Sequence, residues 1–286
     1  MTTKILYYFL LLPISLLPYS ILILISEFLY LIIYKIGKYR KKVVLANLKN
    51  SFPEKSQQEL EKIMINFYRH LCDIIIEIIK MLNTSKSFID NRVTISNIEL
   101  LDKYINRNKT VILVAGHFNN WEWVGQKISI LKQKNWVAVY KPLNNKVFDK
   151  ILKKARVQFG GIALNMDDSI RYIIQTKRQA KIIGIIADQN PVVNSSTKWH
   201  NFFGRQVPVF MGTERIARKM DYPVIFCNMQ KTKRGIYNIF FEELEKNPKN
   251  TNEGDITRKY FNRLEKQIKT EPTQWLWSHR RWRHKK

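Results

Sequence analysis

A histidine and a glutamate five positions apart are the residues of this sequence best suited to chemistry. His117 and Glu122 lie in the stretch Thr110–Val124, TVILVAGHFNNWEWV. A neutral imidazole backed by a carboxylate is a general base, because the carboxylate fixes the tautomer and stabilises the imidazolium that forms on proton removal. Such a pair needs no nucleophilic serine or cysteine if the substrate brings its own hydroxyl group. The alternative is that His117 only shapes a turn and Glu122 only favours a helix N-terminus.

The residues around this pair predict a strand, a tight turn and a helix. An apolar, β-rich run at Val111–Val114 is followed by a break and then by aromatic and aliphatic residues at helical spacing. His117 would follow the carboxyl end of the strand, the edge at which open α/β sheets bind ligands. An N-cap at Asn119 or Asn120 would place Glu122 in the first helical turn, where the helix dipole favours a carboxylate. We therefore expect His117 and Glu122 to meet side by side.

From about residue 92 the sequence alternates short β-rich runs with helical patterns, which is typical of a mainly parallel sheet flanked by helices. Before it, a capping box at Ser56 and Glu59 opens an amphipathic helix. Neither a repeat of fixed period nor a low-complexity linker interrupts the pattern, so we predict one α/β catalytic domain over residues 43–286. The other strands are expected at Trp136–Tyr140, Ile182–Ala187, Pro223–Met229 and Ile236–Phe241, and the helices at Trp121–Leu131, Asn145–Phe159, Asp168–Thr176 and Gly212–Met220.

Other polar residues follow predicted strands at the same edge of the sheet. Lys141 follows the strand expected at Trp136–Tyr140, and Asp188 with Gln189 follows the strand expected at Ile182–Ala187. Lys141 and Arg156 are suited to holding phosphate or another anion, and the alternative for each is a solvated surface position. Asp188 and Gln189 could orient the site, and their alternative is an ordinary turn.

The first 42 residues predict a membrane anchor with a basic segment behind it. Between Ile5 and Tyr34 the only charged residue is Glu27, and a bilayer-spanning helix takes about 20 apolar residues. The apolar run is too long for a cleavable signal peptide and has no small-residue cleavage site. Pro18 and Glu27 also fit a kinked helix that enters one leaflet without crossing. The positive-inside rule puts the rest of the chain in the cytoplasm, because five basic residues follow the run: Lys35, Lys38, Arg40, Lys41 and Lys42.

The net charge of +26 indicates anionic partners. The partner could be nucleic acid, an anionic membrane surface, or a phosphorylated or acidic substrate. The end of the chain, Gln274–Lys286, interleaves tryptophans with basic residues, a mixture that suits single-stranded nucleic acid and lipid headgroups alike. The apolar N-terminal run favours the membrane. Cys72 and Cys227 lie far apart in apolar patterns, which predicts two buried thiols rather than a disulfide or a zinc site.

The string GHFNNWEW around His117 resembles the H-x4-D/E motif of the glycerolipid and lysophospholipid acyltransferase superfamily, in the glutamate form of the bacterial lipid A late acyltransferases. Asn119 departs from the glycine expected there, as in HFGNWE, and glycine tolerates backbone angles that asparagine adopts less readily. Four further blocks resemble that branch in the same order: KPLNNKVFDKILKKARVQFGG (Lys141–Gly161), IIADQNP (Ile185–Pro191), FFGRQVPVFMGTERIARK (Phe202–Lys219) and QWLWSHRRW (Gln274–Trp282).

The resemblance implies an O-acyltransferase of the bacterial inner membrane, with its catalytic domain facing the cytoplasm. His117 would take the proton of an acceptor hydroxyl as the oxygen attacks a thioester carbonyl, and Glu122 would orient the imidazole. Backbone N–H groups at the start of the following helix would stabilise the oxyanion. No acyl-enzyme is expected, because no activated nucleophile is visible.

The resemblance also names the partners. The acyl donor would be acyl carrier protein, or acyl-CoA, and the acceptor an anionic glycolipid, a lipid A precursor. No metal, no redox cofactor and no nucleic acid is expected. We expect substrate contacts from six residues: Asn120, Lys141, Arg156, Asp188, Gln189 and Arg205.

Three alternatives remain open at this point. The same chemistry would serve an aminolipid, a lysophospholipid or a glycosylated phospholipid as acceptor. A membrane-tethered binding protein without turnover belongs to a different class, and so does a basic nucleic-acid binding protein.

Overall fold

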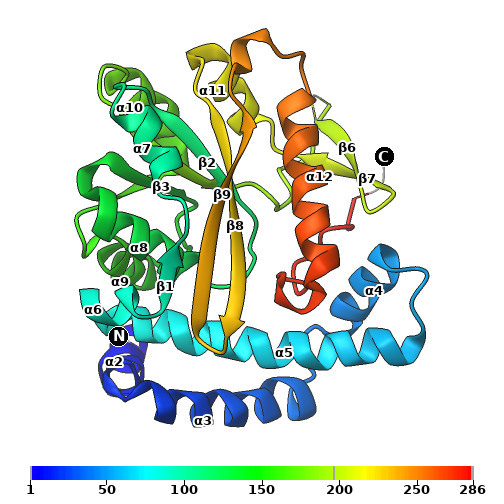
Figure 1. Ribbon diagram of the computed structural model, residues 1–286. Helices are drawn as coiled ribbons and strands as arrows, with labels where there is room; N and C mark the ends of the chain where they lie inside the picture. The colour runs from blue at the N-terminus through cyan, green and yellow to red at the C-terminus, as the bar shows by residue number, and fades with distance from the viewer. Residues whose placement is uncertain (1, 196, 285–286) are drawn as a thin grey trace.

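A seven-stranded sheet runs through the middle of the protein and has helices on both faces (Figure 1). The computed structural model describes residues 2–195 and 197–284. The strand order in the sheet is β1-β9-β8-β2-β5-β3-β4, and β6 and β7 form a separate hairpin. The strands are β1 (Val93–Ile95), β2 (Val111–Ala115), β3 (Trp136–Tyr140), β4 (Ile162–Asn165), β5 (Ile182–Ile186), β6 (Lys198–Phe202), β7 (Arg205–Val209), β8 (Val224–Lys233) and β9 (Ile236–Glu245).

The sheet is parallel through the part that carries the site. β2 pairs in parallel with β5 on one side and with β8 on the other, and β3 pairs in parallel with β4 and β5. Only the pairing of β8 with β9 is antiparallel within this sheet, among the described residues. The predicted α/β class with a mainly parallel central sheet is confirmed.

The helices cover the sheet and extend below it. They are α1 (Thr2–Leu6), α2 (Leu12–Leu16), α3 (Tyr19–Tyr30), α4 (Lys41–Ser51), α5 (Gln57–Lys80), α6 (Lys86–Asp90), α7 (Glu99–Ile105), α8 (Trp121–Lys132), α9 (Lys146–Val157), α10 (Ser169–Gln175), α11 (Gly212–Met220) and α12 (Asp255–Thr270).

Strand β2 is the centre of the core. All five of its residues are buried, because neighbouring strands flank it and helices cover both faces of the sheet. This explains why its sequence is a continuous apolar run rather than an alternating one. The next residues of the chain therefore emerge at the middle of the sheet's carboxyl edge.

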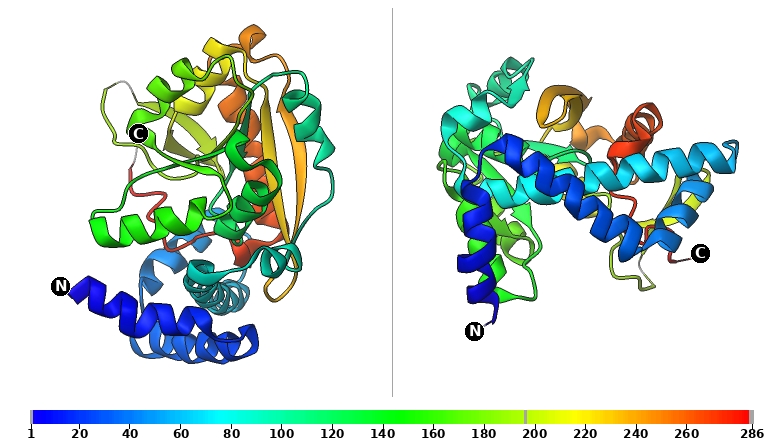
Figure 2. Two further views of the ribbon diagram at one scale, coloured as in Figure 1. Left: turned by 90° about the vertical axis from the view of Figure 1, so that its left-hand side faces the viewer. Right: turned by 90° about the horizontal axis from the view of Figure 1, so that it is seen from below.

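The apolar N-terminal segment forms two helical arms that lie against the domain. The first arm, residues 2–16, ends where Leu17 adopts an extended conformation before Pro18. The second arm, α3 with its π-helical continuation Leu31–Ile36, packs along α5 (Figures 1 and 2). Among the described residues, Tyr19–Ile36 is the one helix long and apolar enough to cross a membrane, with a mean hydropathy of 1.8.

The C-terminal tryptophans pack inside the protein. Trp275 and Trp277 are 2% and 0% exposed and meet the rings of Phe202 and Phe203 in an aromatic cluster. The expectation that this segment presents its tryptophans to lipid headgroups is therefore wrong for these two rings. Lys285 and Lys286 lie outside the described residues.

Candidate active site

The turn between β2 and α8 is held in an unusual backbone conformation. Asn119 has a φ of +53°, in the left-handed region that glycine adopts most easily. Its side-chain amide compensates by donating to Gln274 Oε1 at 2.7 Å and to the carbonyl of Met229 at 3.1 Å. The asparagine that stands in place of the expected glycine therefore takes a glycine-like conformation and ties the turn to the C-terminal segment.

Gly116 lets the turn pass close to two neighbouring elements. A Cβ atom there would lie 2.7 Å from Leu264 Cδ1 and 3.3 Å from Asp188 Oδ2. The first distance is too short for two carbon atoms, so any larger residue would displace the side chain of Leu264 in α12 or the turn itself. The glycine thus permits the approach of the turn to the carboxylate of Asp188.

Asp188 is the carboxylate that contacts His117. Its Oδ1 lies 2.6 Å from His117 Nδ1, and its Oδ2 accepts the backbone N–H of His117 at 2.8 Å. The indole N–H of Trp275 donates to the same Oδ2 at 2.8 Å. β2 and β5 are adjacent parallel strands, so the residues that follow them meet at one edge. The sequence placed Asp188 at this edge, but the pairing with the ring of His117 comes from the structure.

The environment of Asp188 favours the ionised carboxylate. Burial alone would raise its pKa, but the His117 imidazolium and the hydrogen bonds from His117 and Trp275 outweigh burial and lower the pKa from 3.8 to about 2. An ionised acceptor on Nδ1 means that Nδ1 carries the proton in the neutral ring. His117 Nε2 is then the unprotonated nitrogen, which can accept a proton.

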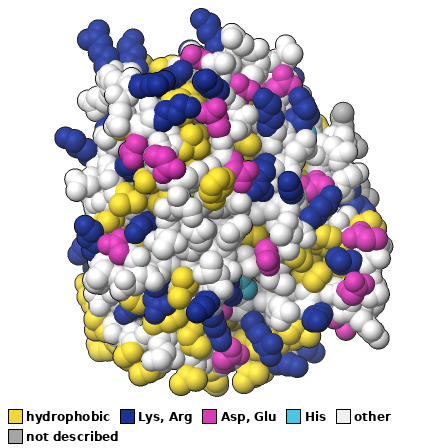
Figure 3. Space-filling view, in the orientation of Figure 1, with side chains coloured by type: hydrophobic (Ala, Val, Ile, Leu, Met, Phe, Trp, Pro, Cys, Tyr) yellow, Lys and Arg dark blue, Asp and Glu magenta, His cyan; other side chains and the backbone are white. Residues whose placement is uncertain are grey.

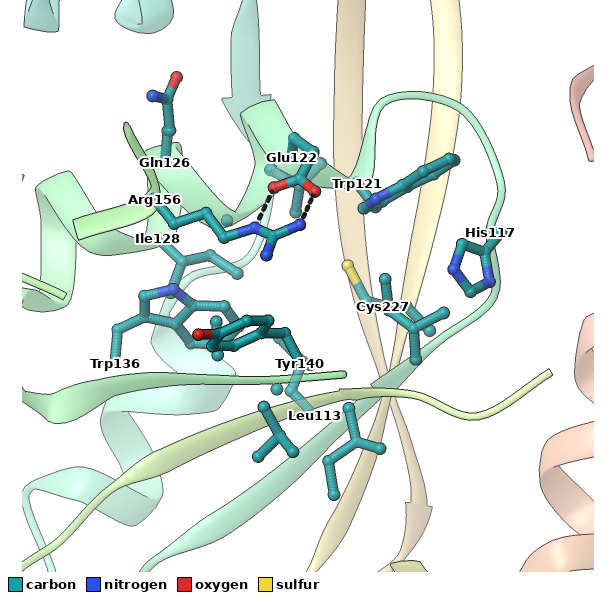
Figure 4. Close-up of a pocket in the computed structure, with 18 of the residues that line it drawn as sticks. Leu113, His117, Trp121, Glu122, Gln126, Ile128, Trp136, Tyr140, Arg156 and Cys227 are labelled. Atoms are coloured by element: carbon teal, nitrogen blue, oxygen red, sulfur yellow. Dashed lines mark hydrogen bonds and ion pairs between the residues drawn. The ribbon is translucent and has the colours of Figure 1, made fainter. Parts of the chain in front are cut away.

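Glu122 contacts Arg156 and not His117, which corrects the expected side-by-side pair. Its Oε2 accepts from Arg156 Nε at 2.8 Å and its Oε1 from Arg156 Nη2 at 2.5 Å, a bidentate pair. Figure 4 shows that Glu122 turns toward Arg156, with the ring of Trp121 on the side of His117. The turn before α8 gives the reason. Asn119, between His117 and the helix, has a left-handed conformation, so the side chains of His117 and Glu122 leave the backbone in different directions.

An apolar cavity of about 450 Å³ extends from His117 into the domain (Figure 4). Polar side chains lie at its mouth, where Gln189 Nε2 is 3.3 Å from His117 Nε2 and the ring of Trp121 packs edge-on to the imidazole. Most of its wall is apolar and is formed by residues of β2, α8, β3, β5 and β8, among them Leu113, Val124, Ile128, Trp136, Ile185, Cys227 and Met229. Gln126 and the Glu122–Arg156 pair add polar groups to the same wall. The base thus stands at the entrance of a space that suits a hydrocarbon chain.

The other expected contact residues lie in three places: the cavity, the protein interior and the exposed β6–β7 hairpin. Lys141, Arg156 and Gln189 line the cavity. Asn120 is fully buried: its Oδ1 accepts the N–H of Trp123 as the N-cap of α8, and its amide donates to Glu77. Arg205 is exposed at the start of β7, in the hairpin rather than in the cavity wall. The structure therefore gives Asn120 a structural role and leaves Arg205 apart from the cavity.

Two residues that hold the site could not be identified from the sequence. Trp275 donates to Asp188, and the hydroxyl of Tyr260 donates to the carbonyl of Ala115 at the end of β2. Both lie more than 80 positions from their partners, and no local pattern marks such contacts. Within the described residues, no group of three or more His, Cys, Asp or Glu side chains is arranged as a metal site.

Comparison with known proteins supplies a family. The model of the bacterial lipid A biosynthesis acyltransferase family matches residues 1–284. Over 270 residues the chain is 23% identical to lipid A biosynthesis palmitoleoyltransferase of Escherichia coli strain K12, covering 93% of this chain and 86% of the relative. It is 22% identical over 283 residues to the lauroyltransferase of the same organism, covering 92% and 89%. The myristoyltransferase of that organism is 25% identical over 146 residues, about half of each chain.

Proposed function

This chain belongs to the bacterial lipid A biosynthesis acyltransferase family and is an acyltransferase, and from its site we propose how it works. It transfers a fatty acyl chain from a thioester donor to a hydroxyl group of a lipid A precursor. The relatives are named for the transfer of palmitoleoyl and lauroyl chains. The observation that carries the mechanism is His117, with Asp188 on one ring nitrogen and the other nitrogen at the mouth of an apolar cavity.

His117 acts as the general base. The acceptor hydroxyl takes the place that Gln189 now occupies beside Nε2 and donates its proton to that nitrogen as its oxygen attacks the thioester carbonyl. The imidazolium that forms is stabilised by the ionised carboxylate of Asp188, 2.6 Å from Nδ1. The tetrahedral intermediate then collapses, the C–S bond breaks, and the proton on Nε2 passes to the leaving thiolate.

The start of α8 supplies donors for the oxyanion. Asn120 accepts the N–H of Trp123, and the preceding N–H groups, those of Trp121 and Glu122, belong to the first helical turn, which has no intrahelical acceptors. These groups and the positive end of the helix are close in sequence to His117 and favour negative charge. Transfer is direct in this mechanism. The buried thiol of Cys227 lies in the cavity wall, but burial raises its pKa far above its usual range, so it is not an activated nucleophile.

The Glu122–Arg156 pair has a positioning role in this proposal. The guanidinium of Arg156 also lies over the ring of Tyr140, 5.1 Å from its centroid, so it joins α8, α9 and the end of β3 around the cavity. Lys141, which is exposed and lines the cavity, is then the cation that meets the anionic groups of donor and acceptor. A phosphorylated glycolipid and an acidic acyl carrier protein are both suited to a chain of net charge +26. Acyl-CoA is the alternative donor.

The test is mass spectrometry of lipid A from cells with the chain, without it, and with a His117→Ala variant in its place. Loss of one acyl chain from lipid A without the protein, and no restoration by the variant, would support both the acceptor and the base. An unchanged lipid A with an acyl chain missing from an aminolipid, lysophospholipid or glycosylated phospholipid would replace the acceptor and keep the chemistry. Restoration of lipid A by His117→Ala would exclude the proposed base.

A further inference from the structure

The two N-terminal arms lie flat across one face of the protein. Seen from below, the first arm and α3 form an angle at Leu17–Pro18, and neither projects away from the domain (Figure 2). In Figure 1 the same arms form the lower edge of the molecule, beneath α5. We call this surface, residues 3–36, the lower face.

Polar contacts hold the inner side of α3 on the domain. The hydroxyl of Tyr19 donates to Glu77 at 2.7 Å, and the hydroxyl of Ser26 donates to Asp73 at 2.6 Å. Arg234, in the turn between β8 and β9, binds Asp73 and also Glu27, with a distance of 2.6 Å to each carboxylate. A helix held by its polar groups at three positions along its length is part of the domain surface.

The first arm is held in the same way at both of its ends. The ammonium of Lys80 donates to the carbonyls of Ser15 and Leu17, at 2.9 and 3.1 Å, where the helix ends. Near the beginning of the arm, Asn145 donates to the hydroxyl of Thr3 at 3.1 Å. The arm therefore runs from the end of α5 to the beginning of α9.

The outer side of both arms is apolar and exposed. In α3 the exposed side chains recur at helical spacing, while Leu22, Ser26 and Tyr30 on the other side are buried. Figure 3 shows hydrophobic side chains gathered along the lower edge, where Figure 1 places α3. The most exposed members are Phe9 (80%), Ile36 (76%), Leu24 (68%), Phe28 (64%), Tyr8 (60%) and Leu16 (60%).

Basic side chains continue this surface. Lys35, Lys38 and Lys42 are exposed directly after the apolar stripe of α3, and Lys4 is exposed on the first arm. An exposed apolar stripe next to lysines matches the interface of a bilayer that contains anionic lipid, where acyl chains lie beneath negative headgroups.

We propose that the lower face docks on an anionic bilayer with both arms in the plane of the interface, so that the chain does not cross the membrane. A spanning α3 would have to break its contacts with Asp73 and Glu77 or draw those carboxylates and Arg234 into the hydrocarbon. Charged groups at that depth are costly. In-plane docking keeps every one of these contacts and buries the exposed stripe. Of the two anchors that the sequence leaves open, spanning and half-inserted, this proposal selects the half-inserted one.

In-plane docking also brings the bilayer close to the cavity. Lys141, Pro142 and Leu143 line the mouth, and Asn145, two residues further on, contacts the first arm at Thr3. A lipid acceptor whose headgroup stays at the membrane surface would then reach His117 by passing along Lys141–Asn145. Access of a lipid acceptor to His117 matters only if the proposed function is right. The in-plane docking itself is inferred from the contacts and exposure of residues 3–36 alone.

Labelling of introduced cysteines distinguishes the two topologies. Lys4→Cys and Lys266→Cys place a thiol on the first arm and on α12, both at exposed positions, and the chain without either substitution is the blank because Cys72 and Cys227 are buried. A membrane-impermeant maleimide is added to spheroplasts or to inside-out inner-membrane vesicles. We expect both thiols to react in the same preparation and to be protected in the other. Reaction of the two thiols in opposite preparations would overturn the proposal and establish a spanning helix.

Vesicle flotation tests whether the lower face binds lipid. Leu24→Glu should reduce binding of the full chain to vesicles of phosphatidylglycerol and phosphatidylcholine by about tenfold or more, because an exposed leucine no longer enters the interface. The matched control is Ile174→Glu, which changes a 51% exposed residue on α10, at the other end of the molecule, and should leave binding unchanged (Figure 1). Equal binding by both variants, or recovery of the unsubstituted chain as a soluble dimer that ignores vesicles, would contradict docking on lipid.

Discussion

The carboxylate of Asp188 lies 2.6 Å from Nδ1 of His117, and the two residues follow neighbouring parallel strands, β5 and β2. The base and the group that orients it therefore come from opposite ends of a stretch of 72 residues and meet because the sheet is parallel. Glu122, the carboxylate nearest to His117 in the motif, binds Arg156 instead. The two carboxylates nearest to the turn therefore have different partners.

Gly116→Ala should reduce kcat strongly while the protein still folds. The added methyl group would lie 2.7 Å from Leu264 Cδ1 and 3.3 Å from Asp188 Oδ2, so the side chain of Leu264 must move, and with it the turn or the carboxylate that the methyl group also crowds. A displacement of about 1 Å at a catalytic group costs on the order of 100-fold in rate. Steady-state kinetics with circular dichroism as the folding control measures this. Unchanged kcat would show that the turn is not held closely against Asp188.

Glu122→Gln should act mainly through stability and the shape of the cavity. It removes one charge of a bidentate pair in which Glu122 is 8% exposed, and leaves the guanidinium of Arg156 without its ionic partner. Loss of one partner of a buried ion pair costs about 3–5 kcal/mol, and partial exposure of Arg156 reduces this to roughly half. Chemical denaturation measures the change in the free energy of unfolding.

The double variant Glu122→Gln with Arg156→Gln is the matched control for that experiment. It removes both charges and should recover part of the lost stability, because no unpaired charge remains. A single variant that unfolds like the unsubstituted chain but has lost all activity would instead assign Glu122 a direct part in the reaction.

Glu77 should make the stability of the protein depend on pH. Burial raises the pKa of its carboxyl from 4.5 to about 7, in spite of hydrogen bonds from Tyr19, Tyr237 and Asn120. The folded chain thus holds this proton more tightly than the unfolded chain does. The stability gained from it is complete below pH 4.5 and is lost as the pH rises to about 7.

Glu77→Gln provides the comparison, because glutamine keeps the shape of the side chain and does not titrate. The free energies of unfolding at pH 5 and pH 8 should differ less for this variant than for the unsubstituted chain, by on the order of 2–3 kcal/mol. The same pH dependence in both proteins would show that Glu77 is not the titrating group. Since Glu77 joins α3 to the N-cap of α8, its stability effect also reports how the lower face is connected to the catalytic turn.

Trp136→Phe should shift the preference for the acyl chain toward longer donors. The indole of Trp136 lines the cavity and lies over Gly184, where a Cβ atom would be 2.1 Å from its Cη2. A smaller ring leaves additional space at this wall, at a cost to stability of about 1–3 kcal/mol. Competition between donors of different chain length measures the preference. Trp282→Phe, the same change in the C-terminal aromatic cluster, is the control and should leave the preference unchanged. An unaltered preference in Trp136→Phe would place the end of the acyl chain elsewhere.

The local elements of the site could be predicted from the sequence. The apolar run of β2 and the helical spacing after it identified the strand and the helix on either side of His117, and β3 was predicted with its observed bounds. The strands β1, β4, β6 and β7 were not predicted, because none of them is a continuous apolar run of five residues like β2, β3 and β5. The helix α12 was also missed, although its buried residues recur at helical spacing.

Partner choice within the site could not be predicted. Whether Glu122 contacts His117 or Arg156 depends on the left-handed conformation of Asn119, and whether Asp188 contacts His117 depends on the close approach allowed by Gly116. The first is a backbone angle and the second a contact between distant segments, and neither can be inferred from the local sequence. The apolar N-terminal segment is a similar case: its composition fits a spanning helix, and the contacts of Tyr19, Ser26 and Glu27 show that α3 lies on the domain.

The central claim, that Asp188 holds His117 as the general base, is tested most directly by kcat of the Asp188→Asn variant in acyl transfer from a thioester donor to a lipid A precursor. The amide cannot stabilise an imidazolium on Nδ1, and we predict a fall in kcat on the order of 100- to 10,000-fold with little change in KM. Asp167→Asn, at an exposed carboxylate, is the matched control and should keep full activity. A folded Asp188→Asn protein with the kcat of the unsubstituted chain would contradict the account.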